Sequence, residues 1–309
     1  MKVLVAGPLE PFLRRAQVPP DIEIELLPEA AELPAGDYVA IVPMLTRRLG
    51  AAELDRLPRL RVIANFAVGY DNVDMAAAQE RGVAVTNTPG VLTEATAELT
   101  WALILAAARR LPEGGALARS GAWQGWGPTQ LLGMGLTGKV LGLLGAGRIA
   151  QAVARRAPGF GMRVAYWSRT RREGWERESG AIYMTRDQLY AASDVLSLHL
   201  ALTPETRSMI GPDALGRMKA GCVLVNTARG GLLDEDALVA ALESGRLRAA
   251  GLDVYAAEPA VSERLRALAN VVLLPHIGSA TEEARQGMWD LAWSNVLAVL
   301  RGSAPLTAV

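Results

Sequence analysis

The stretch VLGLLGAGRIA, residues 140–150, joins a short apolar run to a glycine-rich turn and then to the start of an expected helix. The turn has the pattern G-x-G-x-x-G/A, which becomes informative when a strand precedes it and a helix follows. Its first glycine permits a tight bend, its second lets backbone N–H groups approach a pyrophosphate, and the small Ala150 allows close packing of helix on strand. Unpaired N–H groups at the helix start favour phosphate. The stretch therefore predicts a dinucleotide site made by Gly145, Ala146, Gly147, Arg148 and Ile149.

Short apolar, β-branched runs alternate with helical segments on both sides of this turn, which indicates parallel sheets covered by helices on both faces. The strands expected before the turn are Val3–Ala6, Ile22–Leu26, Tyr38–Val42, Val62–Phe66 and Val83–Thr86. Those expected from the turn onward are Val140–Leu144, Arg163–Trp167, Val195–His199, Cys222–Asn226, Ala249–Val254 and Val271–Leu274. The pattern predicts the α/β fold class with two Rossmann-like, doubly wound domains.

The last expected helix, Glu282–Leu300, is amphipathic and follows the last strand of the second domain. We expect it to cross back to the first domain. A nucleotide-binding domain of residues 99–280 would then be inserted into a discontinuous domain of residues 1–98 and 281–309, with two chain crossings forming a hinge beside a cleft.

A long helix is expected over Thr93–Leu111, apolar almost all round and therefore buried. The loop Ser120–Gly138 follows, rich in glycine and holding Trp123 and Trp126. It is either a surface loop with two anchoring indoles or an arm that embraces a second subunit. The arm is favoured because two tryptophans on a free loop would expose a large apolar area. Residues 99–138 are thus expected to form a dimerisation helix and arm.

The composition is that of a globular chain, with 309 residues of which half are hydrophobic. Lysine plus arginine and aspartate plus glutamate each number 32, so no basic excess favours a nucleic-acid partner. The single cysteine, Cys222, excludes an intrachain disulfide and a thiolate metal cluster, and its apolar setting predicts an inert, packed thiol. No metal site is expected. The N-terminal apolar run is too short for a secretory signal and no run reaches the ~18 apolar residues of a membrane span, so a cytoplasmic location is predicted.

The end of the strand Arg163–Trp167 bears on the choice of dinucleotide. An acid about 20 residues after the glycine turn would bind the ribose 2′-hydroxyl of NAD. Here Ser168, Arg169 and Thr170 follow instead, with no carboxylate among them. These residues form either a solvated basic loop or, as we favour, a site that hydrogen-bonds a 2′-phosphate and offsets its charge. NADP(H) is the expected cofactor, with NAD(H) as the second possibility.

Reduction of a 2-oxo acid by such a cofactor needs a cation for the carboxylate, an acid for the developing alkoxide, and a group that orients that acid. His276, one of two histidines, follows the last expected strand, where ligands bind in doubly wound folds. Glu258 and Arg229 follow two other strands, and the ends of parallel strands can converge. A strand-end histidine is more often structural, so spacing alone does not decide. For His199, a structural or cofactor role is expected, and for Asp71 and Asp74 a turn or cap.

Six segments together resemble the D-2-hydroxyacid dehydrogenase family over nearly the whole chain. They are residues 65–74 (NFAVGYDNVD), 87–90 (NTPG), 145–150 (GAGRIA), 226–231 (NTARGG), 251–259 (GLDVYAAEP) and 275–279 (PHIGS). The resemblance implies that Arg229 clamps the substrate, that Glu258 partners the imidazole, and that His276 is general acid and base. It also implies that the backbone N–H groups of Val68 and Gly69 bind the substrate carboxylate, which makes the discontinuous domain the substrate-binding one.

The resemblance further implies the cofactor contacts. Asp253 would contact the nicotinamide amide. The other implied contacts are Gly145, Ala146, Gly147, Arg148, Ile149, Ser168, Arg169, Thr170, His199, Leu200, Thr206, Thr227, Ala228, Arg229, His276 and Gly278.

Residues 167–170 and the segment 91–98 before the arm are similar to the glyoxylate/hydroxypyruvate reductase branch of this family. In that branch an arm aromatic reaches the active site of the neighbouring subunit, and Trp126 matches it best, which implies a homodimer. The expected activity is reduction of glyoxylate or hydroxypyruvate to the D-2-hydroxy acid. Alternatives are oxidation of phosphoglycerate, D-lactate or phosphite, and a dinucleotide-sensing protein such as the corepressors of this fold.

Overall fold

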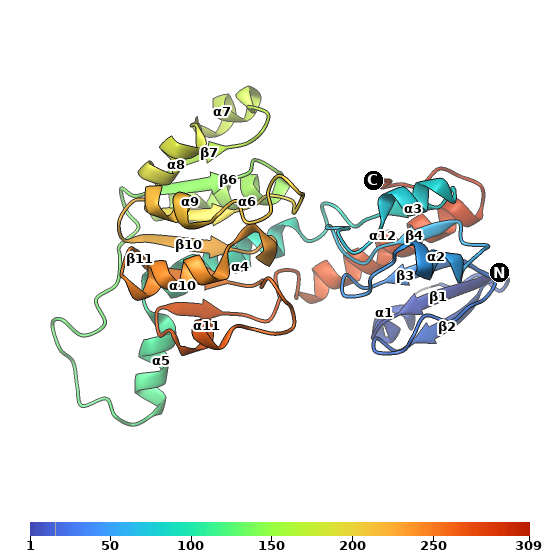
Figure 1. The fold of residues 1–309 in the computed structure, drawn as a ribbon, viewed down its shortest axis with the longest axis horizontal. Coiled ribbons are helices and arrows are strands. Elements are labelled where there is room, and N and C mark those ends of the chain that lie inside the picture. The colour runs from blue at the N-terminus through green and yellow to red at the C-terminus, as the bar shows by residue number, and fades with distance from the viewer. Residues whose placement is uncertain (16) are drawn as a thin grey trace. The chain divides into compact units, whose positions relative to one another are not determined.

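Two β-sheets, each with only parallel strands, organise the protein in a computed structural model that describes residues 1–15 and 17–309 (Figure 1). The smaller sheet belongs to a compact unit of residues 1–92 and 279–309, and the larger sheet to a unit of residues 93–278. The second unit is thus inserted into the first, which confirms the predicted fold class. The smaller unit contains β1 (Lys2–Ala6), α1 (Glu10–Leu13), β2 (Glu23–Leu27), β3 (Tyr38–Pro43), α2 (Ala51–Asp55), β4 (Val62–Ala64), α3 (Met75–Glu80), β5 (Ala84–Thr86) and α12 (Glu282–Leu300).

The sheet of the smaller unit has the order β2-β1-β3-β4-β5. Its central strands β1 and β3 are buried from Val3 to Ala6 and from Tyr38 to Pro43, as expected for a parallel sheet with both faces covered. Helix α12 packs against β3 and β4 and covers one face. Its start is fixed by Thr281, whose side chain accepts a hydrogen bond from the N–H of Ala284. The helix therefore returns the C-terminal part of the chain to the first unit, with the bounds that the sequence predicted.

The larger unit holds the remaining elements. They are α4 (Thr93–Ala108), α5 (Leu111–Arg119), β6 (Val140–Leu144), α6 (Arg148–Arg156), η1 (Ala157–Phe160), β7 (Arg163–Trp167), α7 (Glu173–Ser179), β8 (Ile182–Tyr183), α8 (Arg186–Ala192), β9 (Val195–Leu198), α9 (Pro212–Arg217), β10 (Cys222–Asn226), η2 (Gly230–Leu232), α10 (Glu235–Glu243), β11 (Leu247–Leu252), α11 (Glu263–Ala267) and β12 (Val271–Leu273).

The larger sheet has the order β12-β11-β10-β9-β6-β7-β8. The chain builds outward from β6 in one direction through β7 and β8, and then restarts beside β6 with β9. In doubly wound sheets a ligand crevice lies outside the carboxyl ends of the strands at this point of reversal. The turn after β6 therefore stands where a dinucleotide binds in this fold.

Helix α4 belongs wholly to the larger unit. This unit therefore begins at Thr93, six residues before the boundary at residue 99 that was expected from the sequence. The helix packs against β10, β11 and α6. Glu94 pairs with Arg155 at 2.7 Å, and Glu98 with Arg156 at 3.2 Å, both joining α4 to α6. These ion pairs hold the first turns of α4 against α6, because they begin one residue after α4 starts.

Two expectations about secondary structure were wrong. The helix predicted over Thr93–Leu111 ends at Ala108, and α5 starts separately at Leu111 after Arg110, whose φ of 56° is left-handed. Pro112 explains the break, because in a continuous helix its N–H would bond the Ala108 oxygen, and proline has no N–H and its ring clashes with that carbonyl. The Ala108 oxygen instead accepts the backbone N–H of Met134 at 2.7 Å. The strand β8 was not predicted, since two residues at a sheet edge carry no readable alternation.

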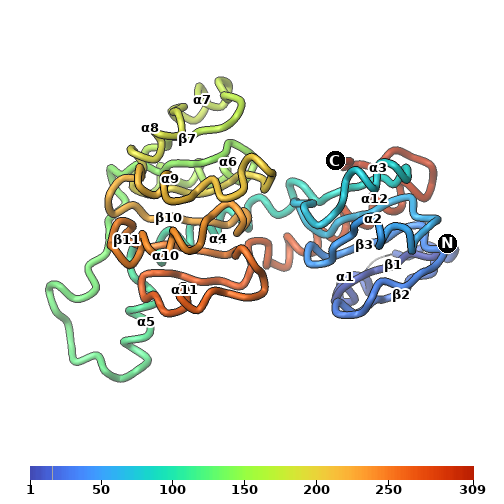
Figure 2. Tube along the Cα trace, viewed as in Figure 1, coloured from blue at the N-terminus to red at the C-terminus, as the bar shows by residue number. Residues whose placement is uncertain are grey.

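The loop predicted over Ser120–Gly138 contains neither helix nor strand. Figures 1 and 2 show this segment, coloured green, extending with α5 away from the sheet of the larger unit. Trp126 in this loop is 84% exposed and Trp123 is 57% exposed. The larger unit thus presents an apolar arm.

Cys222 is buried at the start of β10, and burial raises the pKa of its thiol to about 12. The predicted packing of this thiol is therefore confirmed, and the raised pKa disfavours the reactive thiolate. Among the described residues, no helix combines the length and the apolar character needed to cross a bilayer.

Candidate active site

The turn after β6 has the geometry that a dinucleotide requires. Gly145 has a φ of +117°, and a Cβ there would lie 2.3 Å from the backbone oxygen of His199, so the fold itself needs glycine at this position. Gly147 differs, because its φ is −77° and a Cβ would meet no heavy atom of the described chain within 4 Å. Contacts within the protein therefore do not require glycine at position 147. Space for a ligand to approach the backbone explains the glycine instead.

Helix α6 begins at Arg148, directly after Gly147, and no side chain caps it. Its first N–H groups are thus available to phosphate oxygens, and the helix dipole adds partial positive charge. Ala150 is fully buried beneath this turn, where a larger side chain would separate helix and strand. These residues fit a bound dinucleotide.

In the basic loop after β7, one arginine forms an ion pair and another does not. Arg171 makes a two-pronged contact with Glu176, at 2.8 Å and 2.7 Å, and lies over the ring of Tyr183. Its charge is therefore already compensated. Arg169 makes no ion pair within the described part of the chain, and Ser168 turns its hydroxyl to the backbone oxygen of Thr170 at 2.7 Å. Of these two arginines, only Arg171 is held in a direct ion pair, while the charge of Arg169 acts at longer range and contributes to the lowered pKa of Glu205.

The loops after β11 and β12 bring together the carboxylate and imidazole that the sequence singled out. Glu258 Oε2 lies 2.8 Å from His276 Nδ1. The other carboxylate oxygen accepts the backbone N–H of Tyr255 at 3.0 Å. Burial raises the pKa of Glu258, but the bonds from His276 and Tyr255 outweigh it and hold that pKa below its usual value. The charged carboxylate fixes a proton on Nδ1, which leaves Nε2 as the ring nitrogen free for chemistry.

Arg229 follows β10 in a loop held by Asn226. The Asn226 side chain donates to the Arg229 oxygen at 2.8 Å and accepts the Ala228 N–H at 3.0 Å. The next residue, Gly230, lies against the loop after β11, since a Cβ there would be 1.9 Å from the carbonyl carbon of Tyr255. This close approach sets the Arg229 loop beside the Glu258 loop, and the charge of Arg229 contributes to the lowered pKa of Glu258.

Asp253 has a role that the sequence analysis missed. Its carboxylate accepts the backbone N–H groups of Ile277 at 2.7 Å and Gly278 at 2.8 Å, and its backbone oxygen accepts that of His276 at 2.9 Å. His276 has a φ of 56°, a left-handed conformation that costs free energy unless its surroundings impose it. Asp253 imposes it. Burial raises the pKa of Asp253, although the two N–H bonds act in the opposite direction.

In the smaller unit, the loop after β4 carries the residues expected to bind the substrate carboxylate. Val68 and Gly69 lie in this loop and are partly exposed. Asp74 caps α3 by accepting the N–H of Ala77 at 3.0 Å, as predicted.

Comparison with known proteins decides the family. Residues 101–278 match the family described as D-isomer specific 2-hydroxyacid dehydrogenase, NAD binding domain. The chain belongs to the D-isomer specific 2-hydroxyacid dehydrogenase family. The resemblance inferred from the six sequence segments is thus confirmed, and so is the class of enzyme, a nicotinamide-dependent dehydrogenase.

Relatives with known names lie close in sequence and structure. A glyoxylate reductase of Thermococcus litoralis is 48% identical over 294 residues, covering 92% of this chain and 89% of the relative. A solved protein from Thermus thermophilus has 45% identity and a TM-score of 0.90, covering both chains completely. An NADPH-dependent glyoxylate/hydroxypyruvate reductase from Sinorhizobium meliloti, solved with NADP and malonate, has 37% identity and a TM-score of 0.90, covering 100% of this chain and 96% of that one.

Other cofactor contacts expected for this dehydrogenase lie at the carboxyl ends of neighbouring strands. His199 follows β9, is partly exposed, and has its Nε2 2.9 Å from the hydroxyl of Ser197. Burial lowers the pKa of His199 to about 4, so its ring is neutral at physiological pH. Thr227 follows β10 and shares a hydrogen bond of 2.9 Å with Thr100 of α4. Thr206 bonds the Ala201 oxygen at 2.7 Å within its own loop.

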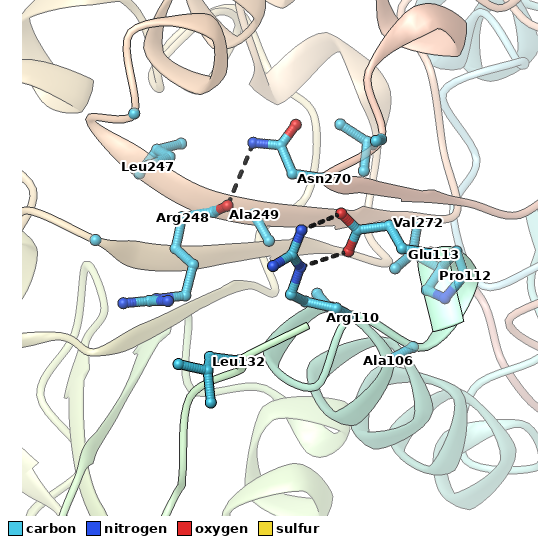
Figure 3. A pocket seen from close by; sticks show the side chains of 15 residues that line it. Ala106, Arg110, Pro112, Glu113, Leu132, Leu247, Arg248, Ala249, Asn270 and Val272 are labelled. Carbon is cyan, nitrogen blue, oxygen red and sulfur yellow. Dashed lines mark hydrogen bonds and ion pairs between the residues drawn. The ribbon is translucent and has the colours of Figure 1, made fainter. Parts of the chain in front are cut away.

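A cavity of about 410 Å³ opens at the opposite edge of the larger sheet (Figure 3). It is lined by residues at the amino ends of β11 and β12, such as Leu247 and Val271, and by the start of α5. Figure 3 shows Arg110 and Glu113 paired at its wall. The dehydrogenase residues follow the carboxyl ends of the same strands, so this cavity is not the active site.

Proposed function

We propose that this dehydrogenase uses NADPH to reduce glyoxylate to the achiral glycolate and hydroxypyruvate to its D-2-hydroxy acid. The observation that carries the proposal is the charged hydrogen bond between Glu258 and His276, set beside the Arg229 loop at the carboxyl edge of a dinucleotide-binding sheet. The relatives named glyoxylate reductase support the choice of substrate.

In the proposed reaction, the bound nicotinamide supplies the hydride that reduces the carbonyl carbon. Arg229 binds the substrate and polarises its carbonyl group, because a guanidinium offers paired donors to carboxylate and carbonyl oxygens. His276 Nε2 gives a proton to the carbonyl oxygen as negative charge develops there. Glu258 stabilises the positive charge that the imidazole carries before this transfer. The N–H groups of Val68 and Gly69 bind the substrate carboxylate.

NADPH is proposed over NADH because the guanidinium of Arg169 is not held in a direct ion pair at the end of β7, while that of Arg171 is bound to Glu176. Arg169→Asp is expected to raise the Michaelis constant for NADPH far more than that for NADH. Arg171→Asp is the matched control, although it also breaks an ion pair, and it should affect both cofactors alike. Equal changes for both cofactors in the Arg169 variant would defeat the preference.

A homodimer is part of the proposal. The exposed Leu111, Trp123, Trp126 and Leu132 all lie on α5 and the arm, and each is at least 57% exposed. Such concentrated apolar area is typical of a protein interface. We propose that the arm packs on a second copy and that Trp126 reaches the substrate site of the partner subunit. Light scattering is expected to give twice the chain mass, and Trp126→Ala to raise the Michaelis constant for the 2-oxo acid. A monomeric wild type would contradict this part.

The substrate is tested by initial rates with glyoxylate, hydroxypyruvate, pyruvate and 3-phosphohydroxypyruvate, each with NADPH and NADH. We expect the highest kcat/KM for glyoxylate or hydroxypyruvate with NADPH. Preference for pyruvate or the phosphorylated acid would make the chain a D-lactate or phosphoglycerate dehydrogenase. Tight NADPH binding without turnover on any acid would favour a dinucleotide-sensing protein. The cytoplasmic location predicted from the sequence belongs to this proposal, and cell fractionation tests it.

A further inference from the structure

Three consecutive carbonyl groups in the loop after β4 are fixed by hydrogen bonds from buried parts of the smaller unit. The Ala67 oxygen accepts the backbone N–H of Thr88 at 2.9 Å. The Val68 oxygen accepts Nδ2 of Asn87 at 2.8 Å, and the Gly69 oxygen accepts Nδ2 of Asn65 at 2.8 Å. Two of the three donors are therefore side-chain amides and not the backbone N–H groups that bind carbonyl oxygens within strands and helices.

These bonds dictate where the N–H groups of the loop point. A trans peptide holds its N–H on the side opposite its C=O. The N–H of Val68 shares a peptide with the Ala67 oxygen, and the N–H of Gly69 shares one with the Val68 oxygen. Both N–H groups are thus turned away from residues 87 and 88, and neither donates a hydrogen bond within the described part of the chain. Two adjacent, unpaired donors form a concave site for an anion.

The two amides are themselves held firmly. Asn65 is fully buried and exchanges hydrogen bonds with Asn72, at 3.2 Å and 3.0 Å. Asn72 is anchored in turn to the Arg47 oxygen at 3.0 Å. Asn87 is 9% exposed, and its backbone oxygen accepts the hydroxyl of Thr307 at 2.7 Å. The loop therefore cannot turn its carbonyls outward without breaking bonds to fixed partners.

We infer that Asn87 is a positioning residue for carboxylate recognition, and that Asn65 supports it by fixing the next peptide of the same loop. By binding the Val68 oxygen, Asn87 holds the N–H of Gly69 in the orientation that receives the substrate carboxylate before substrate arrives. The N–H of Thr88 does the same for the N–H of Val68 through the Ala67 oxygen, and Asn65 fixes the following peptide, between Gly69 and Tyr70. The inference rests on the proposed function in one respect, that a carboxylate binds at Val68 and Gly69. A carbonyl turned outward would repel the same carboxylate, so the amides exclude the unproductive orientation as well as favour the productive one.

The test compares Asn87→Ala with the wild type. Binding at the substrate carboxylate contributes equally to the ground state and the transition state, so loss of it raises KM and leaves kcat nearly unchanged. We expect KM for glyoxylate to rise by about tenfold, and the inhibition constant of oxalate to rise in parallel. The dissociation constant of NADPH should not change, because the dinucleotide residues belong to the other unit. Asn270→Ala is the matched control, since Asn270 also donates to backbone oxygens but lies at the amino edge of the larger sheet.

Asn87→Asp is the second variant in case the alanine variant does not fold. It keeps the shape of the side chain and replaces the donating amide by an oxygen that repels the Val68 carbonyl, so a larger rise in KM is expected. Unchanged KM and oxalate inhibition in a folded Asn87 variant would overturn the inference. A lowered kcat with weaker NADPH binding would overturn it too, since that indicates general loosening of the fold.

Oxalate binding separates this inference from the proposed function. If the wild type binds oxalate beside NADPH but does not reduce glyoxylate, the proposed substrate is wrong, and weaker oxalate binding by the Asn87 variants would still support the positioning role. If the wild type reduces glyoxylate and the variants equal it in KM, the proposed function stands and the positioning role is refuted.

Discussion

Gly147→Ala separates the needs of the fold from the needs of the cofactor at the turn after β6. The added Cβ would meet no described heavy atom within 4 Å, and the φ of −77° suits alanine. Loss of glycine at a helix N-cap costs at most about 1 kcal/mol. The fold is therefore expected to tolerate the change.

The cofactor is expected not to tolerate it. The methyl group would occupy the space through which the pyrophosphate approaches the N–H groups of α6. A hydrogen bond to a charged group contributes about 1.5 kcal/mol or more, so loss of two such bonds weakens NADPH binding by about 3 kcal/mol. This corresponds to a rise of about 100-fold in Kd.

The assay is a fluorescence titration with NADPH, together with thermal unfolding of the cofactor-free chain. Gly145→Ala is the contrasting control, because its Cβ would lie 2.3 Å from the His199 oxygen at a φ of +117°. We expect that variant to lose at least about 2 kcal/mol of stability from strain and overpacking. A Gly147→Ala chain that binds NADPH within twofold of the wild type would refute the assignment of this turn.

Three further predictions concern the catalytic loops and the pH dependence of stability. Glu258→Gln removes the charge beside His276 and should lower kcat/KM about 10- to 100-fold and alter the pH–rate profile, with little change in thermal unfolding; an unaltered profile would contradict the pairing. Gly230→Ala places a Cβ 1.9 Å from the Tyr255 carbonyl carbon, so urea unfolding should show a free energy of unfolding lowered by more than about 2 kcal/mol, and activity should be lost. A stable and active variant would show that the loops carrying Arg229 and Glu258 are not in contact. The pKa of His199 is lowered to about 4 in the folded chain, so between pH 6.5 and 4 the ring is protonated in the unfolded chain but neutral in the folded one. The unfolded chain then binds one more proton, and the free energy of unfolding should fall as pH falls through this window. Because the ring is partly exposed, the His199 share should be about 1–2 kcal/mol, and cofactor-free His199→Gln should show a correspondingly shallower loss or the explanation fails.

Most strands could be predicted from the sequence because buried parallel strands are short apolar runs. The strands β6, β7 and β10 have the predicted bounds, and the rest of those predicted differ by one or two residues at their ends. Edge strand β8 and the break between α4 and α5 could not be read with the same ease, since two residues show no period and a local proline effect competes with a helical pattern.

The candidate site divides in the same way. Glu258 and His276 could be singled out in advance because both follow parallel strands of one sheet, and the family resemblance implied that they pair. The roles of Asp253 and Asn87 could not, because their partners depend on loop conformation: Asp253 binds N–H groups 24 and 25 residues away, and Asn87 binds an oxygen 19 residues away. A polar side chain at a strand end signals a site, and only coordinates tell whether it faces a ligand or the backbone.

The left-handed backbone at His276 has a consequence for protein engineering. Because Asp253 holds this conformation through backbone N–H groups, the loop does not depend on the imidazole for its shape. Glycine and asparagine accept such backbone angles readily, whereas β-branched residues do not. His276→Gly should therefore leave an intact loop around an imidazole-sized space, in which imidazole added to the solvent can restore proton transfer by chemical rescue.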